Sequence, residues 1–281
     1  MIGLGLMGEV LAGRLMAAGF GVLGTDIDPA KNARLAARGG TAASPAEVAN
    51  CGVIALAVFS TEQVEEVVEK VLLPVVAPGT VVICTSTCDP DRIEALGGRL
   101  AGTKIRFLET PVSGTSEQVR AGDGVGLIGG DLKIAAEVAP VLDALFPRRF
   151  HIGRIGDGGR AKLAVNLILG LNRMALAEGL TFAERMGLDA NAFLAVAKGA
   201  ASYSQVMETK GGKMLARDFA PEGRVKQTLK DVHMMLDQGA KLGQELPMLQ
   251  VHCDVLEACV RAGEAERDNS IVVEEIRRRR K

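Results

Sequence analysis

Hydrophobic residues in the first 155 positions fall alternately into short β-rich runs and longer segments with helical spacing. The predicted strands are Val53–Val58, Val81–Thr85, Ile105–Glu109 and Val125–Ile128. The segments between them that have helical periodicity are Thr61–Leu72, Asp91–Leu100 and Lys133–Leu145. This alternation predicts βα units that form a mostly parallel sheet with helices on both faces.

The pattern changes near Gly156. No later segment is convincing as a strand, whereas Arg160–Met186 is rich in alanine and leucine and is interrupted only by glycines. Further predicted helices are Asp189–Lys198, Val225–Leu242 and Pro247–Ala262. A helix of about 40 Å is longer than one small domain needs and leaves an apolar surface to cover. We therefore expect a long joining helix, an all-α second domain and a homodimer or homotetramer.

A G-x-G-x-x-G run, formed by Gly3, Gly5 and Gly8, begins almost at the first residue. In a dinucleotide-binding unit the first glycine permits a tight turn, the second lets the backbone approach a pyrophosphate, and the third lets the helix pack on its strand. The chain has 34 glycines, so the bare pattern also arises by chance, but helical spacing follows it directly. The sequence thus predicts an α/β fold, with a Rossmann-type sheet in residues 1–157 and an all-α domain in residues 158–281.

Asp26 stands 18 residues after Gly8, close to the ~20 expected for a carboxylate that binds the adenosine ribose hydroxyls. The alternative is a turn residue before the Asp28-Pro29 pair. The next residue, Ile27, is apolar where an arginine would suit the 2′-phosphate of NADP. NAD is therefore favoured over NADP as the cofactor.

Few residues precede this glycine run in the sequence. A dinucleotide fingerprint needs a preceding strand of about five residues, and only Met1 and Ile2 stand before Gly3. Either the native chain begins upstream of Met1, or the first strand is unusually short. We expect the former.

Composition is ordinary for a globular chain of one to two domains, with 281 residues, of which 48% are hydrophobic and 24% charged. The net charge of −1, without a basic stripe, argues against nucleic acid as a partner. Five cysteines without C-x-x-C spacing and three scattered histidines indicate reduced packing residues and no metal site. The sequence shows no signal peptide and no uninterrupted apolar stretch near ~20 residues, so we expect a cytoplasmic protein without membrane contact.

Three polar clusters carry the candidate chemistry: Cys84 to Thr87, Glu109 to Thr115, and Gly153 to Asn166. The first two follow predicted strands, at the carboxyl edge of the sheet where open α/β folds bind ligands. In the third, Lys162 and Asn166 are four residues apart and share one face of a helix. A lysine ammonium can donate to an oxygen and exchange its proton there. As isolated residues the two would be an ordinary surface pair.

On four motifs in order, the chain resembles the β-hydroxyacid dehydrogenase family, which includes 3-hydroxyisobutyrate dehydrogenases and tartronate semialdehyde reductases. Gly3-Leu4-Gly5-Leu6-Met7-Gly8 is similar to the family's G-L-G-x-M-G opening, and Pro111-Val112-Ser113-Gly114 to its substrate motif. Gly156-x-Gly158, followed by Lys162 and Asn166, is similar to the catalytic motif, and Lys230-Asp231 to a K-D pair of the second domain. The resemblance covers essentially the whole length.

The resemblance implies an oxidoreductase that transfers a hydride between a nicotinamide cofactor and a small 3-hydroxy acid or its semialdehyde. Lys162 would be the general acid/base, and Asn166 would orient it or the substrate. The residues implied at the substrate are Ser113, Gly114, Thr115 and Lys230. The residues implied at the cofactor are Gly3, Gly5, Leu6, Met7, Gly8, Asp26, Thr87 and Lys230.

Three departures from the family pattern bear on the substrate. Thr115 stands where the family usually has a second glycine, and Cys84 where it often has aspartate. We hypothesise that the Thr115 hydroxyl binds an extra polar group, so that the substrate is a hydroxylated or otherwise polar acid. Lys226, one turn before Lys230, is either solvated or part of a site for a more acidic substrate.

Three other interpretations remain. Imine reductases share the architecture but typically lack the lysine, and a phosphogluconate dehydrogenase would be much longer. A non-catalytic binding protein on the same fold would have lost the lysine. The presence of Lys162, Asn166 and Lys230 together favours the dehydrogenase.

Overall fold

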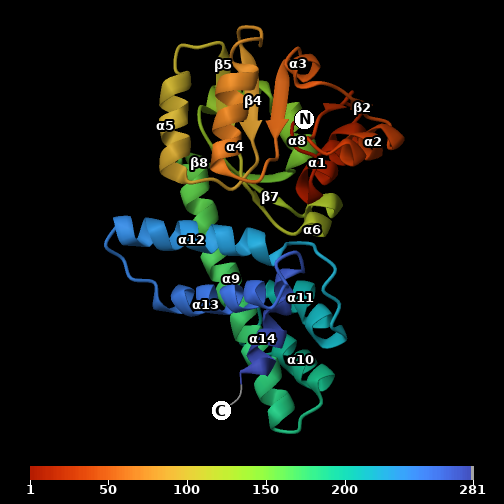
Figure 1. Cartoon of the computed structure of the whole chain (residues 1–281), viewed down its shortest axis with the longest axis vertical. Coiled ribbons are helices and arrows are strands. Elements are labelled where there is room, and N and C mark those ends of the chain that lie inside the picture. The colour runs from red at the N-terminus through yellow and green to blue at the C-terminus, as the bar shows by residue number, and fades with distance from the viewer. Residues whose placement is uncertain (280–281) are drawn as a thin grey trace. The chain divides into compact units, whose positions relative to one another are not determined.

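The computed structural model describes residues 1–279 and divides into two compact units, Met1–Lys162 and the chain from Leu163 onward (Figure 1). This division falls inside one long helix, whereas the sequence predicts a domain boundary after residue 157. Each unit has its own hydrophobic core, and each is described by itself.

The first unit is built on a six-stranded sheet in the order β3-β4-β5-β7-β6, with β8 paired to β7. Its strands are β3 (Val53–Leu56), β4 (Thr80–Cys84), β5 (Ile105–Glu109), β6 (Val112–Ser113), β7 (Val125–Gly129) and β8 (Arg148–Gly153). The β3-β4, β4-β5 and β7-β8 pairs are parallel, whereas β7 is antiparallel to β5 and β6. The predicted α/β fold with a mostly parallel sheet is confirmed.

A second, small sheet joins β1 (Leu23–Gly24) and β2 (Thr41–Ala42) in parallel. Ile2 forms isolated parallel bridges with both Thr25 and Leu56. The backbone beside Ile2 therefore occupies the place between β1 and β3 where a dinucleotide fold has its first strand. Where the native chain begins stays a prediction.

The helices of the first unit are α1 (Leu6–Ala17), α2 (Pro29–Ala37), α3 (Pro45–Val48), α4 (Thr61–Glu66), the π-helix η1 (Val67–Leu72), α5 (Pro90–Leu100), α6 (Ser116–Ala121), α7 (Leu132–Glu137) and α8 (Ala139–Leu145). The sequence predicted a single helix over Lys133–Leu145, and this was wrong. The break lies beside Pro140, because proline has no backbone N–H to continue the hydrogen bonding of the preceding helix.

Hydrophobic burial explains which strands the sequence revealed. All residues of β4 are buried, so this strand appears in the sequence as a continuous apolar run. The residues of β8 are mostly exposed, and the strand has no such run and was not predicted.

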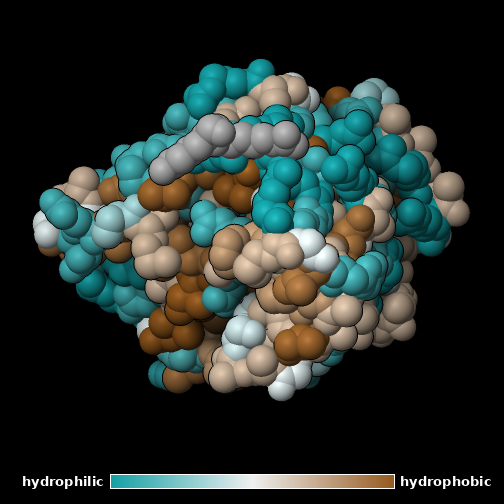
Figure 2. Space-filling view, turned by 90° about the horizontal axis from the view of Figure 1, so that it is seen from below, coloured by the Kyte–Doolittle hydropathy of each residue, from teal (hydrophilic) through white to brown (hydrophobic). Residues whose placement is uncertain are grey.

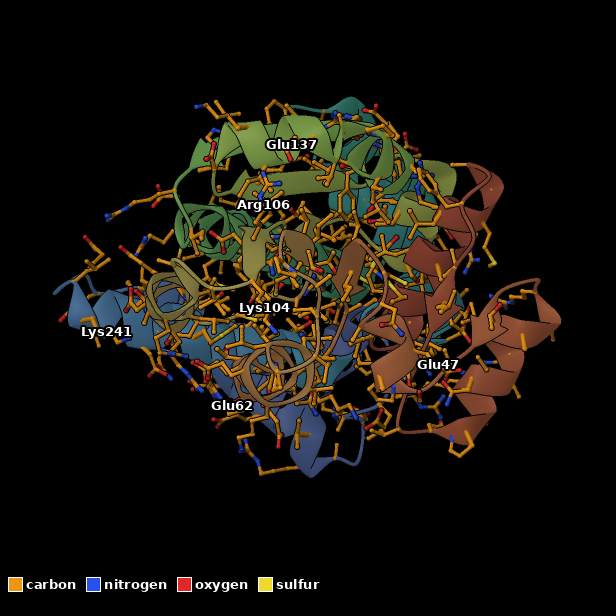
Figure 3. All side chains as sticks on the ribbon, turned by 90° about the horizontal axis from the view of Figure 1, so that it is seen from above. Glu47, Glu62, Lys104, Arg106, Glu137 and Lys241 are labelled. Carbon is orange, nitrogen blue, oxygen red and sulfur yellow. The ribbon has the colours of Figure 1, made fainter. Side chains whose placement is uncertain are left out.

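Helix α7 packs on β5, where Arg106 and Glu137 form an ion pair through two hydrogen bonds with N–O distances of 2.5 and 2.8 Å (Figure 3).

The described part of the second unit is helical apart from one isolated bridge between Arg224 and Asp268. Its helices are α9 (Asp157–Arg185, which begins in the first unit), α10 (Ala190–Gly199), α11 (Gln205–Ala216), α12 (Val225–Lys241), α13 (Pro247–Arg261), the 3-10 helix η2 (Asn269–Ile271) and α14 (Val272–Arg278). This confirms the predicted all-α domain, although α11 and α14 were not predicted.

Helix α9 is long and apolar enough to cross a membrane by length and composition alone. One side of the helix, however, belongs to the core of the helical unit. Met174, Leu176, Ala177 and Leu180 are all buried there. These buried residues account for part of the apolar composition of α9.

A buried ion pair organises the start of α12. Asp268 is fully buried, and both of its carboxylate oxygens lie 3.0 Å from the Lys210 ammonium. The same carboxylate accepts the backbone N–H groups of Glu222, Gly223 and Ser270. Burial by itself raises the pKa of Asp268, but Lys210 and these N–H groups hold it below its usual value. Asp268 is therefore ionised and joins the loop before α12 to η2.

Candidate active site

Gly3, Gly5 and Gly8 lie where the chain enters α1. Gly3 has a φ of +88°, and a Cβ there would lie 2.4 Å from the carbonyl oxygen of Ala57. A Cβ on Gly8 would lie 2.0 Å from the carbonyl oxygen of Gly3. A side chain at either position would collide with backbone, so both positions require glycine.

Gly5 faces open space, since a Cβ built there meets no atom within 4 Å. It is also the N-cap of α1, and no side chain caps the N–H groups of that helix. Uncapped N–H groups beside an open glycine fit the pyrophosphate of a dinucleotide. The backbone N–H groups of Leu6 and Met7 are the ones that would hold it.

Asp26 lies just beyond β1 and is held by its neighbours. Its Oδ2 accepts the N–H of Leu4 at 2.7 Å, and its Oδ1 accepts the N–H of Asp28 at 2.9 Å. The Lys31 ammonium is 3.1 Å from Oδ1. Burial alone raises the pKa of Asp26, but these hydrogen bonds and the Lys31 charge bring it below its usual value. Asp26 is thus a fixed negative charge at the end of β1.

Hydroxyl groups connect the loops that follow β3 and β4. Thr85 Oγ1 donates to the carbonyl oxygen of Leu56, and Ser86 Oγ to that of Val58, both at 2.7 Å. Thr87 follows directly and is half-buried. The loop that carries it is therefore anchored to the neighbouring strand, while its role at the cofactor stays a prediction.

Thr115 has a structural task in addition to its predicted place at the substrate. Its Oγ1 accepts the N–H of Gln118 at 3.2 Å, and Gln118 Oε1 accepts the N–H of Thr115 at 2.9 Å, which makes a capping box for α6. A hydroxyl that accepts one bond still has a proton to donate. Thr115 can therefore cap the helix and donate to a ligand beside Ser113 and Gly114 at the same time.

Glu109 connects the end of β5 to the beginning of α9. Its Oε1 accepts the N–H groups of Gly156 at 2.5 Å and Gly158 at 2.9 Å, and its Oε2 accepts that of Gly159 at 3.2 Å. A Cβ on Gly158 would lie 2.5 Å from the carbonyl oxygen of Leu127. The glycines of the third cluster thus let the helix start close to the sheet, where a buried carboxylate satisfies its first N–H groups.

Lys162 lies in the next turn of α9 and is only 5% exposed. Arg160 adds a second anchor for this turn, because its guanidinium lies 3.1 Å from Asp91 and 2.6 Å from Glu94 on α5. Within the first unit, the beginning of α9 is therefore held to β5 by the Glu109 carboxylate and to α5 by the Arg160 guanidinium.

Asn166, one turn further along α9, belongs to a polar cluster of the helical unit. Its amide Nδ2 donates to Asp231 Oδ2 at 3.0 Å. Asp231 is buried, and its Oδ1 lies 3.1 Å from the Lys230 ammonium. The K-D pair thus fixes the Asn166 amide in this unit, in addition to supplying a cation.

Lys226 is paired outside this cluster. Its ammonium lies 2.5 Å from Glu266 Oε1, and its side chain is 42% exposed. The structure therefore favours the solvated interpretation of Lys226 over a site for a more acidic substrate.

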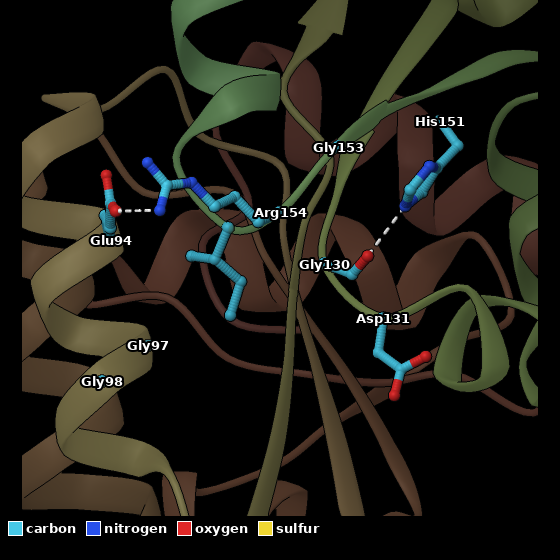
Figure 4. Close-up of a pocket in the computed structure, with 9 residues that line it drawn as sticks. Glu94, Gly97, Gly98, Gly130, Asp131, His151, Gly153 and Arg154 are labelled. Carbon is cyan, nitrogen blue, oxygen red and sulfur yellow. Dashed lines mark hydrogen bonds and ion pairs between the residues drawn. The ribbon is translucent and has the colours of Figure 1, made fainter.

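A shallow groove of about 610 Å³ lies elsewhere in the first unit (Figure 4). Arg154 pairs there with Glu94 at 3.2 Å, and His151 Nε2 lies 2.8 Å from the carbonyl oxygen of Gly130. None of the residues predicted at the substrate or cofactor lines this groove.

Two residues with clear roles were missing from the predicted site. Glu109 was noted only as the start of its cluster, and Asp231 only as half of the K-D pair. A signal for Glu109 exists in the sequence, because an acid at the end of a buried strand must find donors. The sequence does not reveal which donors it finds.

Comparison with known proteins identifies the family. Residues 1–153 match the family model of the NAD binding domain of 6-phosphogluconate dehydrogenase. Residues 156–276 match the model described as NAD-binding of NADP-dependent 3-hydroxyisobutyrate dehydrogenase. An L-threonate dehydrogenase of Cupriavidus necator is 31% identical over 278 residues, which cover 97% of this chain and 94% of that protein. The chain belongs to the β-hydroxyacid dehydrogenase family.

Solved structures agree with this membership. A 3-hydroxyisobutyrate dehydrogenase from Salmonella typhimurium has a TM-score of 0.89 at 26% identity and covers 97% of each chain. A Mycobacterium tuberculosis 3-hydroxyisobutyrate dehydrogenase, solved with L-serine, has a TM-score of 0.86 at 27% identity and covers 98% of this chain and 97% of its own. The resemblance is confirmed: this dehydrogenase transfers a hydride between a nicotinamide cofactor and a small hydroxy acid.

The environment of Glu109 predicts a pH-dependent stability. Burial raises its pKa from 4.5 to about 7, although the glycine N–H groups oppose the rise. The folded state therefore holds a proton more tightly than the unfolded chain, and the stability gained is present at low pH and lost as the pH rises through about 7. A rise of this size corresponds to ~3 kcal/mol.

We expect Glu109→Gln to remove this dependence, because glutamine keeps an accepting oxygen but does not titrate. Free energies of unfolding in urea, measured from about pH 5 to 8, should show the wild type losing stability relative to the variant as the pH rises, because the titrating groups that both proteins share cancel in the difference. Glu137→Gln, which alters an exposed ion pair, serves as the control and should keep the wild-type curve. Equal slopes for the wild type and Glu109→Gln would contradict the assignment.

Proposed function

We propose that this family member is an NAD-dependent dehydrogenase of a small, polar-substituted 3-hydroxy acid, with Lys162 as the general acid/base. The observation that carries the proposal is the burial of Lys162 on α9. This lysine lies one turn before Asn166 and close to the helix start, whose backbone N–H groups Glu109 accepts. A buried ammonium has few water molecules to compete for its proton, which is therefore directed to an oxygen bound beside it.

The nicotinamide ring supplies the hydride acceptor or donor when the cofactor is bound. The residues of the chain do the remaining work. During oxidation the neutral amine form of Lys162 accepts the proton of the substrate hydroxyl and becomes the ammonium, and during reduction the ammonium returns a proton to the carbonyl oxygen. Asn166 orients the lysine or the substrate, with its amide held by Asp231. Ser113, Gly114 and Thr115 hold the carboxylate.

Support for NAD comes from Asp26, whose ionised carboxylate would accept ribose hydroxyls and repel a 2′-phosphate. Ile27 beside it is almost fully exposed and offers no cation. The family models and structures include both NAD and NADP descriptions, so the preference rests on these two residues.

Support for a polar substrate comes from the proton that Thr115 keeps after capping α6. The relative from Cupriavidus necator is named for L-threonate, an acid that carries several hydroxyl groups. A threonine in place of the family's glycine adds both a donor and a methyl group to the wall of the substrate site.

We also propose that the enzyme is a cytoplasmic homodimer or homotetramer. Ile168 and Phe182 on α9 and Met186 just beyond it are all more than half exposed, and Figure 2 shows hydrophobic residues gathered in patches on the face seen from below. Exposed apolar patches of this kind are typical of subunit interfaces. The five cysteines are free, which suits a reducing compartment.

Replacing the acid/base should slow turnover strongly without preventing cofactor binding. We expect Lys162→Ala to lower kcat/KM by about 10²- to 10⁴-fold, the usual range for a lost proton-transfer group. The absorbance of reduced cofactor, followed with NAD and a panel of hydroxy acids, measures this. The control is Lys226→Ala, which removes a lysine paired with Glu266 and should keep wild-type rates. Retained activity in Lys162→Ala would overturn the mechanism.

The same panel tests the substrate class. Hydroxylated acids such as threonate should give a higher kcat/KM than 3-hydroxyisobutyrate, because only they can accept the Thr115 proton at the additional position. Kinetic parameters for 3-hydroxyisobutyrate that match those of the best polyhydroxy acid would refute this assignment while leaving Lys162 unaffected.

Cofactor choice should depend on Asp26 and Ile27. We expect the wild type to prefer NAD, and the double change Asp26→Asn with Ile27→Arg to shift the ratio of kcat/KM values toward NADP by about tenfold or more, or roughly 1.4 kcal/mol. Ile27→Ala alone is the control and should keep the NAD preference. A wild type that uses both cofactors equally well would be evidence against the role given to Asp26.

A further inference from the structure

A group of potential metal ligands lies on two adjacent helices of the second unit. His233 extends from α12, and Cys253 and Glu257 from α13. Glu257 Oε1 is 3.6 Å from His233 Nε2 and 3.9 Å from Cys253 Sγ. The imidazole nitrogen, sulfur and carboxylate oxygen all lie within 4.8 Å of one another.

We propose that these three side chains bind a divalent ion of the zinc type. In a tetrahedral zinc site, bond lengths of about 2.0–2.3 Å place the ligand atoms roughly 3.3–3.8 Å apart. The distances to Glu257 Oε1 are already close to this spacing. Three protein ligands leave a fourth position for water.

The two helices place the ligands for a structural reason. Cys253 and Glu257 are four residues apart and so share one face of α13, and α12 packs along α13. Cys253 is buried in the core of the helical unit, whereas the side chains of His233 and Glu257 are 52% and 44% exposed. The sulfur is thus fixed by the core, and the two exposed side chains can adjust around an ion that enters from solvent.

The chemistry of the ligands selects the class of ion. Imidazole, thiolate and carboxylate together suit Zn²⁺ and its substitute Co²⁺, whereas Mg²⁺ and Ca²⁺ prefer oxygen ligands alone. On binding, the Cys253 thiol loses its proton to solvent and the sulfur forms the bond to the metal. Thiolate and carboxylate then balance the two positive charges of the ion, with His233 neutral. Arg261, 3.6 Å from Glu257 Oε2, contacts the other carboxylate oxygen.

The test uses the full chain, freed of metal with a chelator and titrated with Co²⁺. We expect one ion per chain and the thiolate-to-cobalt absorption band, which Zn²⁺ should abolish by displacement. Cys253→Ser should lose the band, and His233→Gln and Glu257→Gln should bind at least tenfold more weakly. Cys51→Ser, a change in the first unit, is the matched control and should bind like the wild type.

Thermal unfolding supplies a second measurement. Zn²⁺ should raise the Tm of the wild type and of Cys51→Ser, but not that of His233→Gln, since an ion that binds only the folded state stabilises it. His233 is exposed, so its replacement decides the matter even where Cys253→Ser does not fold. A wild type without the thiolate band, or a His233→Gln variant with wild-type affinity, would leave only a His233–Glu257 ion pair and would overturn the proposal.

Discussion

A buried carboxylate that meets the first N–H groups of a helix is the contact on which the candidate active site depends. Glu109 ends β5 inside the sheet, and its oxygens accept the N–H groups of Gly156, Gly158 and Gly159. Without it, these donors and the carboxylate would each be buried without partners, which costs a few kcal/mol. The position of Lys162 follows from this contact, because the lysine lies within the first two turns of the same helix.

Glycine is what permits the contact. The third cluster has glycines at 156, 158 and 159 because the helix approaches the sheet so closely that a side chain at Gly158 would collide with the backbone at Leu127. The glycines of the cofactor loop follow the same logic, since Gly3 and Gly8 are closed in by backbone and Gly5 is left open. In both motifs the backbone approaches a neighbouring backbone segment more closely than a side chain would allow.

The helical unit uses buried acids in a similar way. Asp268 is surrounded by Lys210 and backbone N–H groups, and Asp231 by Lys230 and the Asn166 amide. Each acid holds together segments that are distant in the sequence. The K-D pair therefore has a positioning role in addition to any contact with ligand, and Asn166 is oriented by a partner on another helix.

Local patterns predicted much of this fold. Strand β5 has the predicted bounds, and β3, β4 and β7 differ from theirs by one or two residues, because apolar runs between polar helices are a local property of the sequence. The exposed strand β8, the short β6 and the helices α11 and α14 were not found, since their hydrophobic pattern is weak or their length small. The break before α8 is the opposite error: the periodic hydrophobic pattern predicted one continuous helix although a proline interrupts it.

The sequence by itself determined the family and the alternation of strands and helices in the first unit, because these are encoded in short motifs and in hydrophobic spacing. Only the tertiary structure decided the partners of those residues. Glu109 and Gly156 are 47 residues apart, and Asn166 and Asp231 are 65 apart. It also showed that Lys226 is paired with Glu266. Such pairings depend on how the elements pack against each other, and spacing along the chain carries no record of that.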